Sequence, residues 1–233
     1  YEIGVRLVGS EMCIRDRGNA DSKAVRTKGR SITIRHFKRI FKKVHSAPQL
    51  VGVCGSVHNV GTTHISLALC NYMSNKCMYR TAYVELNGTH EILSLSKTAD
   101  EKVFTYKNVD FFPHAVMSTL TEILNMRYER VIIDFGILNP NTLKEFMRCD
   151  VRIAVCTISK WNRGALNRII ELFNSNKITD SESVKILFNL VEKKKTINHK
   201  HFKYPVVDFP YLEDPFLINT SLFGTLDKIS ERN

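Results

Sequence analysis

The residues best suited to chemistry form a loop of small side chains after the first apolar run of the sequence. Residues 50–54 (LVGVC) open into residues 55–64 (GSVHNVGTTH), and an apolar helical pattern begins directly afterwards. A loop between a strand and a helix N-terminus brings backbone N–H groups together, and the helix dipole there favours an anion. The spacing therefore indicates a phosphate cradle. The alternative is a structural turn in which Thr62 and Thr63 cap the helix.

The loop also matches part of the Walker A pattern GxxxxGK[ST] of phosphate-binding loops. Ser56 stands at the first Gly of this pattern, Gly61 at the second, Thr62 at the Lys and Thr63 at the Ser or Thr. Thr63 could therefore bind Mg²⁺ through its hydroxyl, whereas the position that normally carries a positive charge is neutral. Many strand–helix turns match as well as this one, so the loop alone does not establish nucleotide binding.

Short β-branched runs alternate with longer amphipathic patterns from residue 50 onward. We expect strands at 50–54, 81–85, 109–112, 130–134, 151–156, 184–188 and 206–209, and helices at 63–75, 115–126, 141–148 and 162–174. Such alternation predicts an α/β fold in a single domain, with one doubly wound, mostly parallel sheet covered by helices on both faces. Ligands bind at the carboxyl ends of the strands in this architecture. We therefore expect the chemistry in the loops that follow the strands.

The order of these motifs resembles the ParA/MinD superfamily (SIMIBI class) of deviant-Walker P-loop NTPases. The family's loop reads KGGVGKTT, and residues 59–63 (NVGTT) align with it without gaps. Later segments resemble family strands in the same order: 83–87 (YVELN) the second strand, 128–136 (YERVIIDFG) the Walker B strand, 184–189 (VKILFN) the strand whose terminal Asn reads adenine, and 206–210 (VVDFP) the last strand before a proline-containing loop. The resemblance spans about residues 49–215 and is nearest to the MinD-like proteins of pilus assembly and secretion.

The resemblance implies a set of site residues. ATP or ADP would contact Ser56, Val57, His58, Asn59, Val60, Gly61, Thr62, Thr63, His64, Asn189 and Pro210. Thr63 and Asp134 would hold Mg²⁺, and Glu85 and Asp134 would be the catalytic residues. Glu85 stands where the family's Asp orients the attacking water. The alternative for Asp134 is a carboxylate that caps a loop at the end of its strand.

The departures from the family pattern weaken the expected chemistry. Thr62 replaces the Walker lysine, which normally places a positive charge on the β- and γ-phosphates. Val57 replaces the family's signature lysine, which reaches across a dimer to the partner's nucleotide, so the homodimer is an open question. His58 and Asn59 replace two glycines. We therefore expect a degenerate Walker A loop and weak or absent ATP hydrolysis.

Three functions fit these residues. The first is a degenerate MinD/ParA-like nucleotide-binding protein that acts with protein partners as a regulatory or positioning factor in a bacterial secretion or pilus-type system. The second is a nucleotide-free pseudo-ATPase scaffold, in which the loop is only a turn. The third is an active ATPase that uses another cation in place of the lysine. Metal-dependent binding of ATP separates the first from the second.

The first 48 residues differ in composition from the rest. Residues 1–17 include VGSEMCIRDR, which resembles translated sequencing-adapter read-through; the alternative is a natural arm. We expect residues 1–30 to form a disordered or artefactual arm. Residues 31–48 are predicted to form a basic amphipathic helix and linker, followed by the ParA/MinD-like domain over residues 49–233.

Most of the net charge of +11 lies near the N-terminus, because residues 18–50 carry a net +8. Within residues 31–45, apolar side chains recur on one helical face, namely Ile34, Phe37, Phe41 and Val44. This helix either packs on the domain or makes a peripheral contact with an anionic membrane. The remaining residues are close to neutral, so we do not expect specific nucleic-acid binding.

The composition is typical of a globular protein, with 43% apolar and 24% charged residues, and the six cysteines form no CxxC pair, which indicates a reducing cytoplasm. No apolar stretch approaches the ~20 residues that span a bilayer, and no signal-peptide pattern precedes the basic segment. The localisation that we expect is cytoplasmic, with peripheral attachment at the inner face of the membrane as the alternative. Trp161 could contact a partner or cover a core edge, and His199 and His201 belong either to a solvated basic loop or to a metal site.

Overall fold

The computed structural model describes residues 47–98, 101–157, 159, 162–176, 178, 184–191 and 202–231. The chain divides into two units, Tyr1–Val44 and His45–Asn233, and every described residue belongs to the second unit. The N-terminal arm, the predicted helix over residues 31–45, Trp161, His199 and His201 lie outside the described residues.

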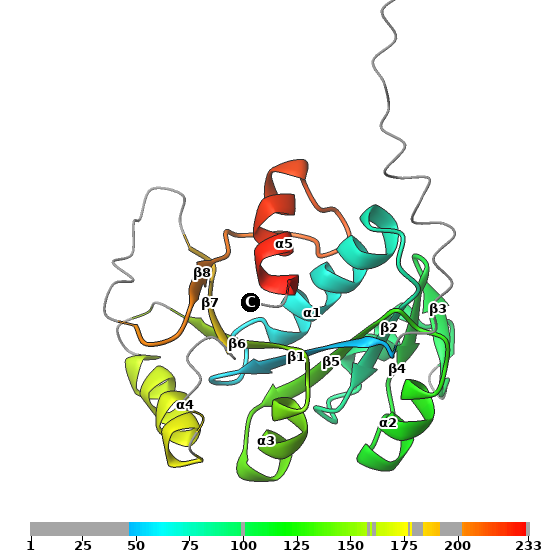
Figure 1. Cartoon of the computed structure of the whole chain (residues 1–233). Coiled ribbons are helices and arrows are strands. Elements are labelled where there is room, and N and C mark those ends of the chain that lie inside the picture. Colours follow the sequence, from blue (N-terminus) through cyan, green and yellow to red (C-terminus); the bar gives the residue numbers. More distant parts are fainter. Residues whose placement is uncertain are drawn as a thin grey trace, which may run out of the picture. The chain divides into compact units, whose positions relative to one another are not determined.

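The centre of the second unit is a sheet of eight described strands in the order β3-β4-β2-β5-β1-β6-β7-β8 (Figure 1). The strands are β1 (Gln49–Gly55), β2 (Thr81–Glu85), β3 (Phe104–Tyr106), β4 (Val109–Phe112), β5 (Arg130–Ile137), β6 (Val151–Thr157), β7 (Lys185–Asn189) and β8 (Val206–Asp208). Every neighbouring pair is parallel except β3 and β4. The predicted doubly wound, mostly parallel sheet is therefore confirmed.

Helices cover both faces of the sheet, as the alternating sequence pattern predicts. They are α1 (Thr62–Asn71), α2 (Met117–Leu124), α3 (Pro140–Met147), α4 (Arg163–Ser175) and α5 (Phe223–Ser230). Figure 1 shows α1 and α5 on one face and α2, α3 and α4 on the other. Each face has its own apolar core because side chains alternate along a strand. On β5, for example, Ile132 points into the α1 side, whereas Val131 and Ile133 point into the α3 side.

Several elements differ from the predicted ones. The first helix ends at Asn71 and continues as a π-helical turn, Tyr72–Lys76, in which the Cys77 N–H donates to the Tyr72 carbonyl. Strand β5 runs three residues beyond Asp134, to Ile137. The sequence pattern missed β3, an edge strand of three residues, and α5, a helix of eight residues, because such short elements show too little periodicity. Among the described residues, no helix is long and apolar enough to cross a bilayer.

Candidate functional site

The loop between β1 and α1 has a backbone that only certain residues permit. Gly61 has φ +95°, and Asn59 has φ +58°, both in the left-handed region that favours Gly and Asn. A Cβ on Gly55 would collide with the Thr62 hydroxyl, and one on Gly61 would collide with the amide of Asn189. The two glycines therefore let the loop turn tightly from the strand into the helix.

The backbone N–H groups of this loop have no hydrogen-bond acceptor among the described residues. None of the hydrogen bonds in the described part of the chain has a backbone N–H of residues 57–64 as its donor. Gly61 is the N-cap residue of α1, and no side chain caps the helix, so the alternative in which Thr62 or Thr63 acts as the cap is wrong. A row of free N–H groups at a helix N-terminus is the arrangement that binds anions.

Asp134, on β5, is fully buried next to this loop. Its Oδ2 accepts hydrogen bonds from the Thr63 hydroxyl at 2.7 Å, the Tyr83 hydroxyl at 2.9 Å and the Asn87 amide at 3.2 Å. Its Oδ1 accepts one from the Gly136 N–H at 2.9 Å, two residues later in the same strand, so Asp134 does not cap a loop at the strand end as the structural alternative expects. Burial raises the pKa of Asp134, and the four donors oppose that rise because they stabilise the charged form.

Glu85 ends β2 and is the parallel-register partner of Asp134. It is only 1% exposed. Its Oε1 accepts a hydrogen bond of 3.1 Å from the Thr89 hydroxyl, whereas its Oε2 has no hydrogen-bond partner in the described structure. Burial raises the pKa of Glu85 to about 7, and the nearby charge of Asp134 adds to the rise, against the hydrogen bond from Thr89.

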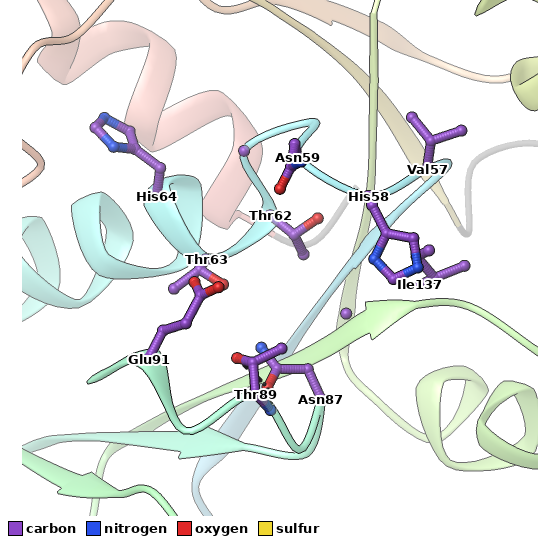
Figure 2. A pocket seen from close by; sticks show the side chains of 12 residues that line it. Val57, His58, Asn59, Thr62, Thr63, His64, Asn87, Thr89, Glu91 and Ile137 are labelled. Carbon is purple, nitrogen blue, oxygen red and sulfur yellow. Dashed lines mark hydrogen bonds between the residues drawn. The ribbon is translucent and has the colours of Figure 1, made fainter. Parts of the chain in front are cut away.

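A cavity of about 290 Å³ opens beside the loop (Figure 2). Its lining comes from three strand ends: Val57, His58, Asn59, Gly61, Thr62, Thr63 and His64 after β1, Asn87, Thr89 and Glu91 after β2, and Gly136 and Ile137 at the end of β5. Figure 2 shows Glu91 directed towards Thr63 from across the cavity. No Lys or Arg is among these lining residues. Burial lowers the pKa of His64, against a hydrogen bond to Leu212 and the charge of Asp214, so its surroundings favour the neutral form of this side chain.

The structure brings most of the predicted site residues together. Seven of the predicted nucleotide-binding residues line the cavity, while Ser56 and Val60 belong to the same loop but not to the lining. Asn189 lies beside the loop, where its amide nitrogen donates to the Val60 carbonyl at 3.0 Å and its oxygen accepts from the Leu190 N–H. Pro210 follows β8 and does not line the cavity. Glu85, the last residue of β2, is adjacent in register to Asp134, which lies three residues before the end of β5, and neither residue lines the cavity.

The sequence reasoning missed the opposite wall of the cavity. That wall consists of Asn87, Thr89, Glu91, Gly136 and Ile137. All five follow, or end, strands whose carboxyl ends face the β1–α1 loop. The rule that ligands bind at such ends could have identified the segments but not the individual side chains.

Comparisons with known proteins agree with this geometry at the level of the fold. No protein-family model matches the sequence, and no curated protein matches it. Among solved structures, the chain is similar to a plasmid partition protein from Borrelia burgdorferi bound to AMPPNP, with a TM-score of 0.55 and 15% identity over 78% of this chain and 96% of that one.

Two further structures have the same fold. Cobyrinic acid a,c-diamide synthase from Mycobacterium smegmatis, with bound ATP analogue and magnesium, has a TM-score of 0.53 and 13% identity over 77% of this chain and 90% of its own. MinD in the MinC:MinD cell division complex from Aquifex aeolicus has a TM-score of 0.51 and 12% identity over 77% and 86%. The described part of the chain therefore has the fold of the ParA/MinD-type P-loop ATPases.

Proposed function

We propose that the chain binds an adenine nucleotide together with Mg²⁺ in the cavity beside the β1–α1 loop. The observation that carries this proposal is the row of backbone N–H groups of residues 57–64, which no described acceptor uses. Those of residues 62–64 lie in the first turn of α1, where the helix dipole adds a partial positive charge. Phosphate is the ligand that such a loop satisfies best.

The residues beside the loop fit a magnesium ion. Thr63 offers a hydroxyl and Asp134 a carboxylate, and the two are in direct contact at 2.7 Å. Hydroxyl and carboxylate oxygens are the hard ligands that Mg²⁺ prefers. The orphaned, buried Oε2 of Glu85 adds a further oxygen without a partner in the described structure. When bound, the ion would neutralise phosphate charge, and Thr63 and Asp134 would hold it.

We expect slow or absent ATP hydrolysis because the cavity lining lacks cationic side chains. The position of the Walker lysine is Thr62, and no described side chain that lines the cavity is a Lys or Arg. Phosphoryl transfer depends on cations that stabilise charge on the transferred group, so their loss slows the reaction more than it weakens binding. A cavity without cationic side chains suits a protein that holds nucleotide to control its state.

We therefore assign the chain a regulatory or positioning role in the bacterial cytoplasm, exercised through protein partners. The resemblance to MinD-like proteins points to a secretion or pilus-type system and leaves a homodimer as one mode of association. The similar structures support the general kind of role, since one is a plasmid partition protein and another is MinD in complex with MinC. The nucleotide-free scaffold remains the second candidate, favoured by the lack of a lysine in the cavity lining.

Calorimetric titration of the full chain with ATP and ADP, in Mg²⁺ and again in EDTA, tests the proposal. We expect binding that requires Mg²⁺. Thr63→Ala should weaken it roughly tenfold or more, the effect of losing one contact to a charged group. Thr121→Ala, an exposed threonine on α2, is the matched control and should change nothing. Folded protein that binds neither nucleotide in Mg²⁺ would establish the scaffold instead.

A further inference from the structure

We propose that a pocket at the C-terminal end of α1 docks a segment of a partner protein in which an apolar side chain lies next to carboxylates. The pocket has a volume of about 540 Å³. It is lined by residues from the end of α1 and the π-helical turn, by residues 216–219 and by Phe223. We call it the α1-end pocket; it shares no lining residue with the cavity beside the β1–α1 loop. Only the need for a partner rests on the proposed function.

The walls of the α1-end pocket are fixed by a network of side-chain amides. Asn71, the last residue of α1, donates to the Pro215 carbonyl at 3.1 Å and accepts from the Asn75 amide at 2.8 Å. In the turn between β3 and β4, Asn108 donates to Asn75 at 2.8 Å, and its carbonyl accepts from the Ser74 hydroxyl at 2.7 Å. Three segments are therefore tied together around the pocket. A pocket that is already ordered loses less entropy when it binds.

The lining includes apolar surface that the described residues leave uncovered. Leu217 is 70% exposed, although it belongs to the same lining as Phe216 and Phe223. The rings of Tyr72 and Phe223 pack with their centroids 5.3 Å apart, and the Tyr72 hydroxyl donates to Asp227, which does not line the pocket. Covering such surface removes apolar atoms from water, which is the main favourable contribution to most protein association. The pocket therefore suits an apolar side chain of a partner.

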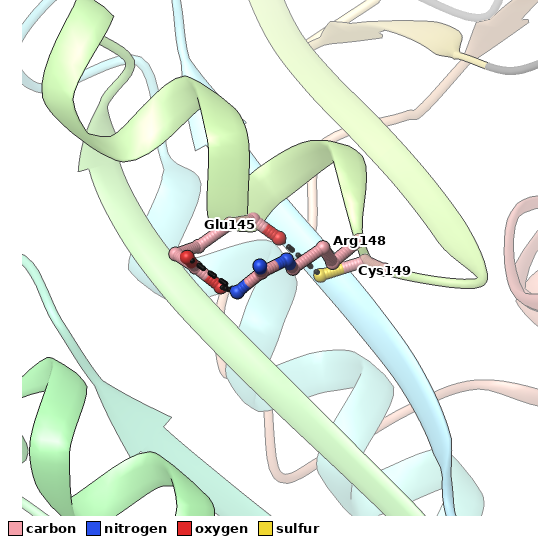
Figure 3. Close-up of polar contacts among 3 residues, drawn as sticks. All are labelled: Glu145, Arg148 and Cys149. Carbon is pink, nitrogen blue, oxygen red and sulfur yellow. Dashed lines mark hydrogen bonds and ion pairs between the residues drawn. The ribbon is translucent and has the colours of Figure 1, made fainter.

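Two lysines give this pocket a positive charge. Lys76 and Lys107 are exposed, and their ammonium groups lie 5.0 and 5.2 Å from the centres of two aromatic rings of the lining. Neither lysine forms an ion pair among the described residues, whereas Arg148 on α3 is bound by Glu145 at 2.8 Å (Figure 3). None of the described lining residues is Asp or Glu. Carboxylates are the charge complement of this pocket, so the occupant is an acidic segment.

The place of the pocket on α1 suits a partner that responds to the β1–α1 loop. Thr62 begins this helix of ten residues beside the loop, and Asn71 ends it at the pocket. A docked segment would therefore contact the far end of the helix whose first turn faces the nucleotide of the proposed function. Docking itself does not require nucleotide, and it can be measured in its absence.

The test uses a phage-displayed library of short random peptides as the probe and the immobilised, nucleotide-free full chain as the target. We expect the selected peptides to combine Asp or Glu with Leu, Phe or Trp. Fluorescence anisotropy of the labelled peptides then gives their affinity, which should fall as salt is raised from ~0.1 M to ~1 M, because the screening length shortens from about 10 Å to about 3 Å. Selected peptides that lack acidic residues, or a library that yields no binder, would overturn the proposal.

Two variants locate the binding. Leu217→Ser and the double variant Lys76→Gln, Lys107→Gln should each weaken the selected peptides roughly tenfold or more, as expected for residues at the centre of an interface. All three side chains are exposed, so the variants should fold, and circular dichroism checks this. Peptide affinity that is unchanged in the folded variants would overturn the proposal.

Matched controls separate the pocket from general charge and apolar surface. Met126→Ser removes an exposed apolar side chain just after α2, on the other face of the sheet, and Lys97→Gln with Lys144→Gln removes two exposed lysines elsewhere. These controls should change peptide affinity far less than the pocket variants. Equal losses in controls and pocket variants would mean that the peptides recognise no particular surface, and would refute the docking site.

Further measurements distinguish a second copy of the chain and the proposed function. A dimer seen in sedimentation of the wild type and dissociated by Leu217→Ser would show that a second copy fills the pocket, and would overturn the partner proposal. Peptide docking by a chain that binds no ATP would retain the docking site and remove the nucleotide. ATP binding by a chain that docks no peptide would preserve the nucleotide site and refute the docking site.

Discussion

Asn189, at the end of β7, donates a hydrogen bond of 3.0 Å to the carbonyl oxygen of Val60, 129 residues earlier in the chain. Strand β6 lies between β7 and β1, so the contact crosses a whole strand. The same amide fills the space that a side chain on Gly61 would need. Asn189 therefore fixes the β1–α1 loop from the side, and its oxygen is held in turn by the Leu190 N–H at 2.9 Å.

Asn189→Ala should loosen the loop. The change leaves the buried carbonyl of Val60 without this donor, which costs about 1–3 kcal/mol of the free energy of unfolding. Hydrogen exchange should accelerate in residues 57–64 more than in the sheet. Asn174→Ala, at an exposed position of α4, is the control. Unchanged exchange in the loop would show that Asn189 does not hold it.

The sheet could be predicted in detail because its strands are buried on both faces. The predicted bounds 81–85 and 109–112 coincide with β2 and β4, whose apolar runs end at turn residues. Strand β5 runs past its predicted end because Ile137 still pairs with Gly55 of β1, beyond an irregularity in the register. Gly136 adopts φ +60° within this stretch, a backbone state that no hydrophobic pattern encodes. A Cβ on residue 136 would lie only 2.6 Å from the Cβ of Asn87, which explains why this position is Gly.

One wall of the candidate site could be predicted and the other could not. The loop over residues 55–64 is visible in sequence because it combines small residues with a strand before it and a helix after it. Thr89 and Glu91 belong to a segment around η3 (Glu91–Leu95), which begins after His90 with φ +57°. A short 3₁₀ turn is too brief to show a hydrophobic period in the sequence. The contact of the preceding Thr89 with Glu85 is therefore known only from the fold.

Tyr83→Phe should destabilise the protein through Asp134. The hydroxyl of Tyr83 is one of four donors to this buried carboxylate, and its removal costs about 1–3 kcal/mol because the acceptor is charged. Urea denaturation measures the loss. Tyr211→Phe, on a side chain that is 70% exposed, should have no effect. Equal stability of Tyr83→Phe and wild type would show that Asp134 does not depend on this donor.

Lys185→Met should release the C-terminal end of α5. The buried ammonium donates to the carbonyls of Lys228 and Glu231, both at 2.6 Å, so the apolar replacement should cost about 2 kcal/mol. Lys97→Met, at an exposed position, is the control. Faster hydrogen exchange in α5 would show that the lost stability belongs to this helix. A variant as stable as wild type would show that the two hydrogen bonds of Lys185 do not stabilise the protein.

The contribution of Lys185 should also depend on pH. Burial lowers the pKa of Lys185 from its ordinary 10.5. Between the lowered pKa and 10.5, the unfolded chain binds more protons at this position than the folded one, so stability rises with pH. The stability of wild type relative to Lys185→Met should therefore increase as the pH is raised towards 10.5. A constant difference across this range would show that the pKa is the same in both states.

Thr62→Lys should raise the affinity for ATP. The position lines the cavity at the start of α1, and a lysine there would place a positive charge next to phosphates held by the loop. A charge-assisted contact of about 1.5–3 kcal/mol corresponds to roughly a tenfold to hundredfold gain in affinity. Thr62→Met, with a long but uncharged side chain, is the control for bulk. Calorimetry with ATP and Mg²⁺ measures the difference. Equal affinities in the two variants would mean that position 62 does not face bound phosphate, and folded Thr62→Lys protein that binds no ATP would contradict a nucleotide site in this loop.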